Sequence, residues 1–167
     1  MGRAIYMANV LGLDVGMYYK RKDYTRVING RNPVVAHEFL GSSVEGKDMI
    51  IIDDMISSGD SALEVAAALK ARKAKRIFIC STFGLFTAGL DRFDKAYDKG
   101  TFDRILTTNL IYQPPELLER EWYIDCDLSK YIAYIIDTLN HDSSISDLLN
   151  PVERIHSIVA RYHNGEL

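Results

Sequence analysis

The chain has 167 residues, of which 47% are apolar, and a formal net charge of −3. This size and composition suffice for one domain with a packed core, and the lack of a basic excess argues against a nucleic-acid partner. No apolar run approaches the roughly 20 residues that a membrane-spanning helix needs, so we expect no membrane partner either.

The first forty residues contain three predicted elements. Apolar residues recur at helical spacing over residues 3–12, which predicts an amphipathic helix. Strands are predicted over Val15–Tyr19 and Pro33–Leu40, and the basic, turn-rich stretch Lys20–Asn32 separates them. The most regular part of the chain comes after these elements.

From residue 49 onward, short apolar runs alternate with helical patterns. This alternation predicts an α/β domain with a parallel sheet and helices on its faces. In such sheets, ligands bind beyond the carboxyl ends of the strands, which here indicates the loops 53–61, 82–89 and 107–114. The predicted strands are Met49–Ile52, Ile77–Thr82, Arg104–Thr108 and Trp122–Asp125, and the predicted helices lie near residues 62–74, 90–97 and 132–139.

The first of these loops carries the strongest local signal. Segment Ile50–Ser61 reads IIIDDMISSGDS, so that Asp53 and Asp54 directly follow a buried strand and precede two hydroxyls and a glycine. Ser61 stands three residues before Glu64, a spacing that predicts a capping box at the start of the next helix. The unpaired amides of a helix N-terminus form a ready site for an anion.

A sugar phosphate would satisfy both halves of this loop. The amides and the hydroxyls of Ser57, Ser58 and Ser61 would hold the phosphate, while Gly59 would let the backbone approach it closely. The two carboxylates would accept hydrogen bonds from the sugar hydroxyls or coordinate Mg²⁺ through hard oxygen atoms. The alternative, a loop whose acids only cap the helix, stays open on these residues alone.

The residues around this loop resemble a known family. Segment Val44–Leu69, VEGKDMIIIDDMISSGDSALEVAAAL, resembles the phosphoribosyl-binding motif of the type I phosphoribosyltransferase fold, a three-layer α/β fold with a parallel sheet. The segments RAIYMANVLGLDVGMYYKRKDY, STFGLFTAG, TTNLIY and SSISDLL are similar, in order, to landmarks of the ribose-phosphate pyrophosphokinase family. The resemblance runs from Arg3 to about Asn150.

The resemblance implies an activity and a set of partners. Members of this family transfer a diphosphoryl group from ATP to the 1-hydroxyl of ribose 5-phosphate with the help of Mg²⁺. They have two similar halves and assemble as homo-oligomers. The family's acidic, glycine-rich pyrophosphate loop would precede Arg3, so the chain is expected to correspond to the second half only.

Site residues follow by position from the same resemblance. Asp53 and Asp54 match the acidic pair that meets the ribose and the metal. Lys20 and Lys22 fall in a mobile catalytic loop, where two cations would neutralise charge on the transferring group. Without the resemblance, Lys20–Lys22 is a solvated basic turn. The positions that match the 5-phosphate loop are Ser57, Ser58, Gly59, Asp60 and Ser61.

Four positions depart from the family pattern. Ser57 replaces an aspartate that many relatives carry, and Asp60 stands near a usual glycine and adds a negative charge to the loop. Lys22 replaces an arginine, which turns a planar two-pronged contact into a point charge. Phe83 stands where a histidine is expected. Such changes are consistent with a subfamily's variation or with weakened activity.

Three functions therefore stay open. The chain is the C-terminal half of a ribose-phosphate diphosphokinase, which needs an N-terminal half or a full-length enzyme and turns over poorly alone. Alternatively, it is a non-catalytic phosphoribosyl-binding module that regulates or accompanies such an enzyme. A complete base phosphoribosyltransferase is less favoured, because neither a hood for the base nor a pyrophosphate loop is evident.

The remaining expectations concern organisation and compartment. Residues 1–150 are predicted to form the phosphoribosyltransferase-like domain, and residues 151–167 a helical tail. Cys80 and Cys126 are far apart without metal-ligand spacing, so we expect reduced thiols. The first residues are not followed by a signal-peptide pattern, and together with the reduced thiols this predicts a cytoplasmic protein.

Overall fold

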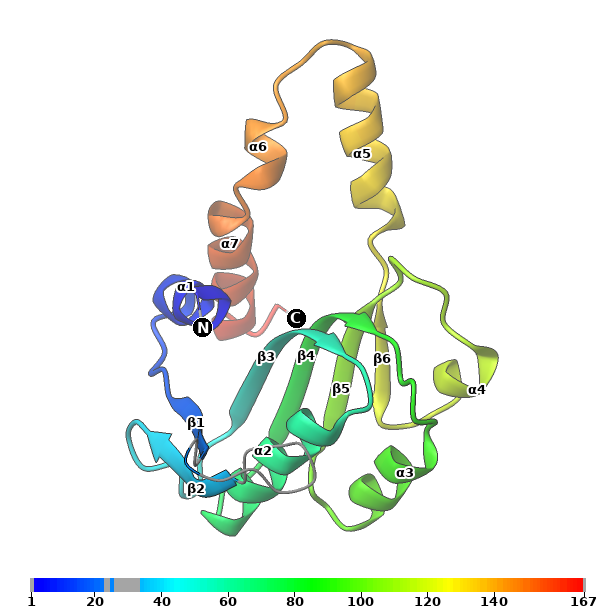
Figure 1. Ribbon diagram of the computed structural model, residues 1–167. Coiled ribbons are helices and arrows are strands. Elements are labelled where there is room, and N and C mark those ends of the chain that lie inside the picture. Colours follow the sequence, from blue (N-terminus) through cyan, green and yellow to red (C-terminus); the bar gives the residue numbers. More distant parts are fainter. Residues whose placement is uncertain (1, 23–24, 26–33, 167) are drawn as a thin grey trace. The chain divides into compact units, whose positions relative to one another are not determined.

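The structure, a computed structural model, describes residues 2–22, 25 and 34–166. It divides the chain into two compact units, Met1–Ser43 and Val44–Leu167, and each unit is described by itself (Figure 1). The elements in chain order are α1 (Gly2–Leu11), β1 (Met17–Lys22), β2 (Val34–Leu40), β3 (Met49–Ile56), α2 (Asp60–Ala71), β4 (Ile77–Gly84), α3 (Asp91–Asp98), β5 (Arg104–Thr108), α4 (Pro115–Leu118), β6 (Tyr123–Cys126), α5 (Ser129–Asn140), α6 (Ser146–Leu149) and α7 (Val152–His163).

The first unit contains α1 and an antiparallel pair of strands. Met17 of β1 lies opposite Leu40 of β2, and the register shifts between Arg21 and Lys22. Both strands were expected from the sequence, but β1 continues through Lys22 rather than ending at Tyr19. The start of the basic stretch is therefore strand and not turn.

The second unit is built on a four-stranded parallel sheet in the order β3-β4-β5-β6. Ile51, Ile79 and Ile105 lie side by side on neighbouring strands, and Tyr123 continues the row on β6. Each strand pairs with the strand that follows it in the chain, as expected for strand–helix repeats with crossovers of one hand. The predicted α/β class with a parallel sheet is confirmed.

Helix α2 packs against this sheet through small residues. Its buried side chains, Ala62, Ala66 and Leu69, recur at i, i+4 and i+7 and thus form one stripe along the helix. In Figure 1 the helix crosses in front of the sheet, and it contacts β3. The β-branched side chains of Ile77 and Ile79 are fully buried, which is typical of a strand covered by a helix.

An aromatic cluster forms the core beside α3. Phe93 stacks on Trp122 with ring centroids 5.7 Å apart and meets Phe86 edge-on at 5.0 Å. Phe102 meets Trp122 edge-on at 5.9 Å, and Phe93, Phe102 and Trp122 are at most 2% exposed. These contacts fix α3 against the segment that leads into β6.

The structure corrects some predicted boundaries. Strand β3 runs to Ile56, so Asp53 and Asp54 lie in the strand rather than in the loop after it. The short helices α4 and α6 were not predicted, because four residues are too few to show a helical period. Among the described residues, none of the helices is long and apolar enough to cross a membrane.

Candidate functional site

The carboxyl ends of β3, β4 and β5 bring together the three loops that the sequence indicated. Leu85 N–H donates to Ile56 O at 2.8 Å, and Thr87 N–H donates to Ser57 O at 3.0 Å, so the loops after β3 and β4 are hydrogen-bonded along their length. Thr108 Oγ1 donates to Thr82 O at 2.6 Å, which attaches the end of β5 to that of β4.

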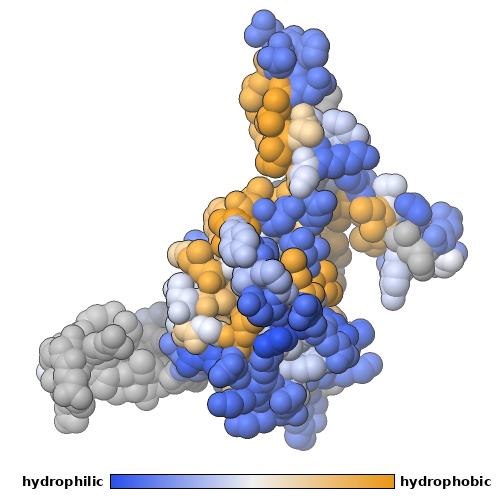
Figure 2. Space-filling view, turned by 90° about the vertical axis from the view of Figure 1, so that its right-hand side faces the viewer, coloured by the Kyte–Doolittle hydropathy of each residue, from blue (hydrophilic) through white to orange (hydrophobic). Residues whose placement is uncertain are grey.

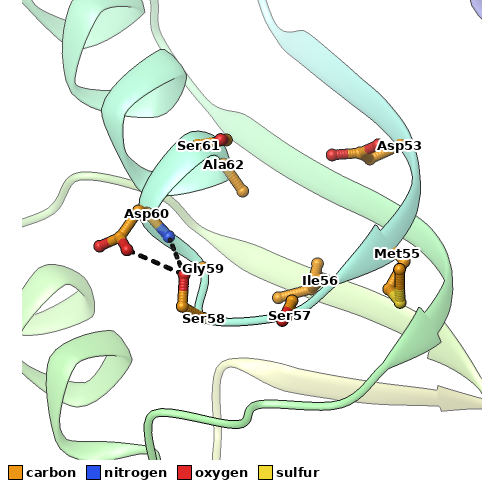
Figure 3. Close-up of a pocket in the computed structure, with 9 residues that line it drawn as sticks. All are labelled: Asp53, Met55, Ile56, Ser57, Ser58, Gly59, Asp60, Ser61 and Ala62. Carbon is orange, nitrogen blue, oxygen red and sulfur yellow. Dashed lines mark hydrogen bonds between the residues drawn. The ribbon is translucent and has the colours of Figure 1, made fainter. Parts of the chain in front are cut away.

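A small cavity of about 120 Å³ lies in the loop between β3 and α2. This volume is many times the roughly 10–15 Å³ that one water molecule needs, so the cavity has room for a polyatomic anion. In Figure 3, Asp53 on β3 and Ser61 on α2 point toward each other across it. The lining residues are Asp53, Met55, Ile56, Ser57, Ser58, Gly59, Asp60, Ser61 and Ala62.

The first turn of α2 forms one wall of this cavity. The helix begins at Asp60, with Gly59 as the residue before it, and Leu63 N–H makes the first intrahelical bond, to Gly59 O at 2.9 Å. The amides before Leu63 therefore have no acceptor within the helix, as at any helix start. No side chain caps the helix, so the predicted capping box of Ser61 and Glu64 is wrong. Apart from the Asp60 N–H, which donates to Ser58 Oγ at 3.4 Å, the amides before Leu63 are thereby left to interact with an anion.

The glycine in the loop has a structural reason that the sequence did not show. Gly59 adopts φ +85°, a left-handed conformation in which a side chain is strained. A Cβ built on Gly59 would lie 2.1 Å from Cζ of Phe93, which is fully buried under the loop. Gly59 is thus required by the close packing of α3 against the loop.

The hydroxyls of the loop already have neighbours. Ser57 Oγ lies 3.3 Å from Thr87 Oγ1, and Ser58 Oγ donates to Asp60 Oδ2 at 2.8 Å, as Figure 3 shows for the latter pair. Asp60 N–H donates weakly back to Ser58 Oγ at 3.4 Å. Asp60, which the sequence marked as a departure, therefore holds the hydroxyl of Ser58 within the loop.

The two aspartates of β3 do not share the cavity. Neighbouring side chains of a strand point to opposite faces, and only Asp53 is among the lining residues. Asp53 Oδ1 also accepts the N–H of Asp54 at 2.8 Å. Within the described residues, no group of three or more acidic, histidine or cysteine side chains could hold a metal ion by itself.

Lys20 and Lys22, the predicted catalytic cations, lie on β1 of the first unit. The side chains of both fall outside the described residues, so their catalytic role stays a prediction.

Arg92 is a residue of the site that the sequence analysis missed. It lies in the first turn of α3, and its Nη1 donates to Ser58 O at 2.9 Å and lies 2.8 Å from Asp60 Oδ1. The signal that could have found it is its place just after the 82–89 loop, which the fold rule had already indicated.

The side chains at the end of β5 mainly make hydrogen bonds to neighbouring strands. Thr107 is buried, and its Oγ1 lies 2.7 Å from the hydroxyl of Tyr123. Burial raises the pKa of the Tyr123 hydroxyl, although the bond with Thr107 partly offsets this. Further along, Asp127 accepts from Ser129 and Asn109, and these bonds hold the pKa of its carboxyl below the usual value.

A family model matches most of the chain. The model is described as the phosphoribosyl synthetase-associated domain and matches residues 27–150. That range includes the whole cavity loop.

The chain is also similar in sequence to curated proteins, over a comparable range of residues. The chain is 30% identical over 149 residues to a ribose-phosphate pyrophosphokinase of Vibrio cholerae, which covers 89% of this chain and 44% of that protein. It is 32% identical over 127 residues to a ribose-phosphate pyrophosphokinase of Thermococcus kodakarensis, covering 71% of this chain and 41% of that protein. The chain thus spans less than half the length of the curated relatives that it matches.

A solved structure shares the fold. The crystal structure of phosphoribosylpyrophosphate synthetase from Mycobacterium smegmatis superposes with a TM-score of 0.64 over 86% of this chain and 43% of that one, at 20% identity. The expected fold, of the phosphoribosyltransferase type, is therefore confirmed.

Proposed function

Because the chain belongs to the phosphoribosyl synthetase-associated domain family, we propose that the cavity at the start of α2 binds the phosphate of ribose 5-phosphate. In this proposal the chain is the ribose-binding half of a ribose-phosphate diphosphokinase. That enzyme moves the β,γ-diphosphoryl group of ATP to the 1-hydroxyl of ribose 5-phosphate and releases AMP.

One observation carries the proposal: amides, hydroxyls and the carboxylates of Asp53 and Asp60 line a single cavity. The first turn of α2 offers amides without intrahelical acceptors, and Ser61 adds a hydroxyl, which together favour a phosphate. Asp53 faces Ser61 from the strand and can accept hydrogen bonds from sugar hydroxyls (Figure 3). A phosphate and a polyol joined in one ligand would use both walls.

Mg²⁺ and ATP belong to the same proposal. Magnesium in phosphate-transferring sites is usually held by one or two carboxylates together with oxygen atoms of the substrate. Asp53 offers such a carboxylate in the cavity, and Asp54 lies next to it on the other face of β3. The ion, when bound, would neutralise charge on the transferring diphosphoryl group. Asp53 would at the same time orient the ribose.

The activity proposed for the chain depends on a second half. The curated relatives are more than twice as long as the matched range, and ATP contacts would come from the part that the match leaves out. We therefore expect ribose 5-phosphate binding by the chain alone, and turnover only after an amino-terminal half or a full-length enzyme is added. The proposed setting for this reaction is the cytoplasm, where the two free cysteines stay reduced.

An exposed apolar stripe supports the proposed homo-oligomer. Ile132, Ile136 and Leu139 recur along one side of α5, and Ile136 and Leu139 are 61% and 57% exposed. In Figure 2, apolar side chains line the projecting part of the second unit where α5 lies. An apolar surface of this kind is typical of an interface, and a second copy of the chain is the proposed partner. Ile136→Glu should then lower the molecular mass measured by analytical ultracentrifugation.

A non-catalytic module that binds phosphoribosyl groups is the second candidate. The observation that favours it is the carboxylate of Asp60 within the loop, where it accepts a hydrogen bond from the Ser58 hydroxyl. A chain that binds ribose 5-phosphate, yet adds no turnover to an amino-terminal half, would support this candidate.

Calorimetric titration of the full chain with ribose 5-phosphate tests the binding site. Replacing Asp53 by Asn and Ser61 by Ala removes two contacts with the ligand and should weaken binding roughly tenfold or more. Asp48→Asn serves as the comparison, since Asp48 is the same residue type just before the amino end of β3, where it pairs with Arg76. Unchanged affinity in the Asp53→Asn, Ser61→Ala variant would show that the site lies elsewhere.

A further inference from the structure

The first turn of α3 is attached to the proposed phosphate loop by a charged contact. One nitrogen of Arg92, Nη1, donates to the carbonyl oxygen of Ser58 at 2.9 Å and lies 2.8 Å from Asp60 Oδ1. The guanidinium thus contacts the loop on both sides of Gly59. This contact joins two separate segments, the loop after β3 and the helix after β4, by an ion pair.

The position of Arg92 is fixed by its neighbours on α3. Phe93 is fully buried in the aromatic cluster and lies directly under Gly59. Asp94 accepts from Trp122 Nε1 at 2.7 Å and from Arg120 Nε at 3.0 Å. Three consecutive residues of α3 are therefore held to the loop or to the core, so Arg92 is presented to the loop by a rigid support.

Asp60 opposes the binding of an anion in two ways. Its negative charge lies in the first turn of α2, among the residues that line the cavity, and repels a phosphate. Its Oδ2 also accepts a hydrogen bond from Ser58 Oγ at 2.8 Å, so this hydroxyl is directed at a carboxylate rather than at a ligand. Both effects are reduced when a cation is paired with the carboxylate.

We propose that the Arg92–Asp60 pair sets the affinity of this loop for phosphate, with Arg92 as a positioning residue that neutralises Asp60. This inference rests on the proposed function and deepens it, because it names the charge balance that selects the ligand. With the pair intact, the loop accepts the dianionic end of a sugar phosphate. Without Arg92, the carboxylate loses this cation and disfavours an anion there.

The test is a charge cycle measured by calorimetry on the full chain. Arg92→Gln, Asp60→Asn and the double variant are titrated with ribose 5-phosphate, inorganic phosphate and uncharged ribose. Arg92→Gln should weaken and Asp60→Asn should strengthen the binding of both anions, each on the order of threefold to tenfold at low salt. The double variant should fall between them. Ribose affinity should stay the same, which a merely structural role of the pair would not predict.

Arg76→Gln is the matched control. Arg76 pairs with Asp48 at the amino ends of β3 and β4, at the opposite edge of the sheet, so this variant removes the same charge away from the loop. Its affinity for phosphate should equal that of the wild type, and thermal melting should show that all variants are folded. The anion effects should also shrink as salt is added.

The outcomes separate the inference from the proposed function. Wild-type binding of ribose 5-phosphate without opposite shifts in the two single variants overturns the inference alone. A wild-type chain that binds inorganic phosphate but not ribose 5-phosphate, with opposite shifts in the two single variants, supports the inference and contradicts the proposed function. If neither the wild type nor the Asp60→Asn variant binds phosphate or ribose 5-phosphate, both are overturned.

Discussion

Replacing Gly59 by alanine tests how the phosphate loop is held. The backbone at this position has φ +85°, and a Cβ would lie 2.1 Å from Cζ and 2.8 Å from Cε1 of Phe93. The ring cannot easily retreat, because Phe93 is fully buried and stacked on Trp122. The loop itself must therefore move, and with it the cavity wall.

Two costs add up in this variant. A left-handed conformation costs a residue with a side chain about 1–2 kcal/mol. Forcing a methyl group into a packed core costs about 1–3 kcal/mol more. The sum is about 2–5 kcal/mol, which for a chain of this length lowers Tm by roughly 4–20 °C.

Gly89→Ala provides the matched control. Gly89 has a similar φ of +77°, but nothing lies within 4 Å of the Cβ that alanine would add. This variant should show only the conformational cost of about 1–2 kcal/mol in urea unfolding. Adding Phe93→Leu to Gly59→Ala should recover part of the loss as a favourable coupling energy. Equal destabilisation by Gly59→Ala and Gly89→Ala would refute the reasoning.

Three further predictions concern groups outside the loop. Thr107→Val leaves the buried Tyr123 hydroxyl without its partner and should lower the free energy of unfolding in urea by about 1–3 kcal/mol. The double variant with Tyr123→Phe should lose less, and an equal loss in both would show that the 2.7 Å contact contributes nothing. Burial raises the pKa of the Cys80 thiol, so iodoacetamide at pH 8 should modify it much more slowly in the native than in the urea-unfolded chain, and equal rates would contradict this. Hydrogen bonds from Ser129 hold the pKa of the Asp127 carboxyl below its usual value, so Asp127 stabilises the fold above about pH 4 and loses this contribution as the pH falls further. Asp127→Asn should therefore make the free energy of unfolding fall less steeply at acid pH. An unchanged acid limb of the stability–pH curve would count against the bond.

The main architecture was accessible from the sequence because it depends on repetition. Three strands of the parallel sheet begin at the residues predicted from the sequence, which are Met49, Ile77 and Arg104. The rule that ligands bind at the carboxyl ends of such strands then indicated the correct loops, since it follows from topology alone.

The predictions that were wrong or missed concern details that depend on contacts between residues far apart in the sequence. The capping box at Ser61 was a local pattern, but the residue that precedes the helix is Gly59, two positions before Ser61, where the close approach of Phe93 leaves no room for a Cβ. Arg92 was missed because its partner, Asp60, lies 32 positions away in the sequence, and one sequence shows no pairing of charges over that distance.

The central claim is that the amides opening α2 hold the phosphate. Amide proton–nitrogen NMR spectra of the isotopically labelled chain test it residue by residue during titration with ribose 5-phosphate. The account predicts the largest shifts at Ser58–Ala62, with inorganic phosphate moving the same signals and ribose leaving them in place. Shifts confined to other segments, or none at saturating ligand, would contradict it.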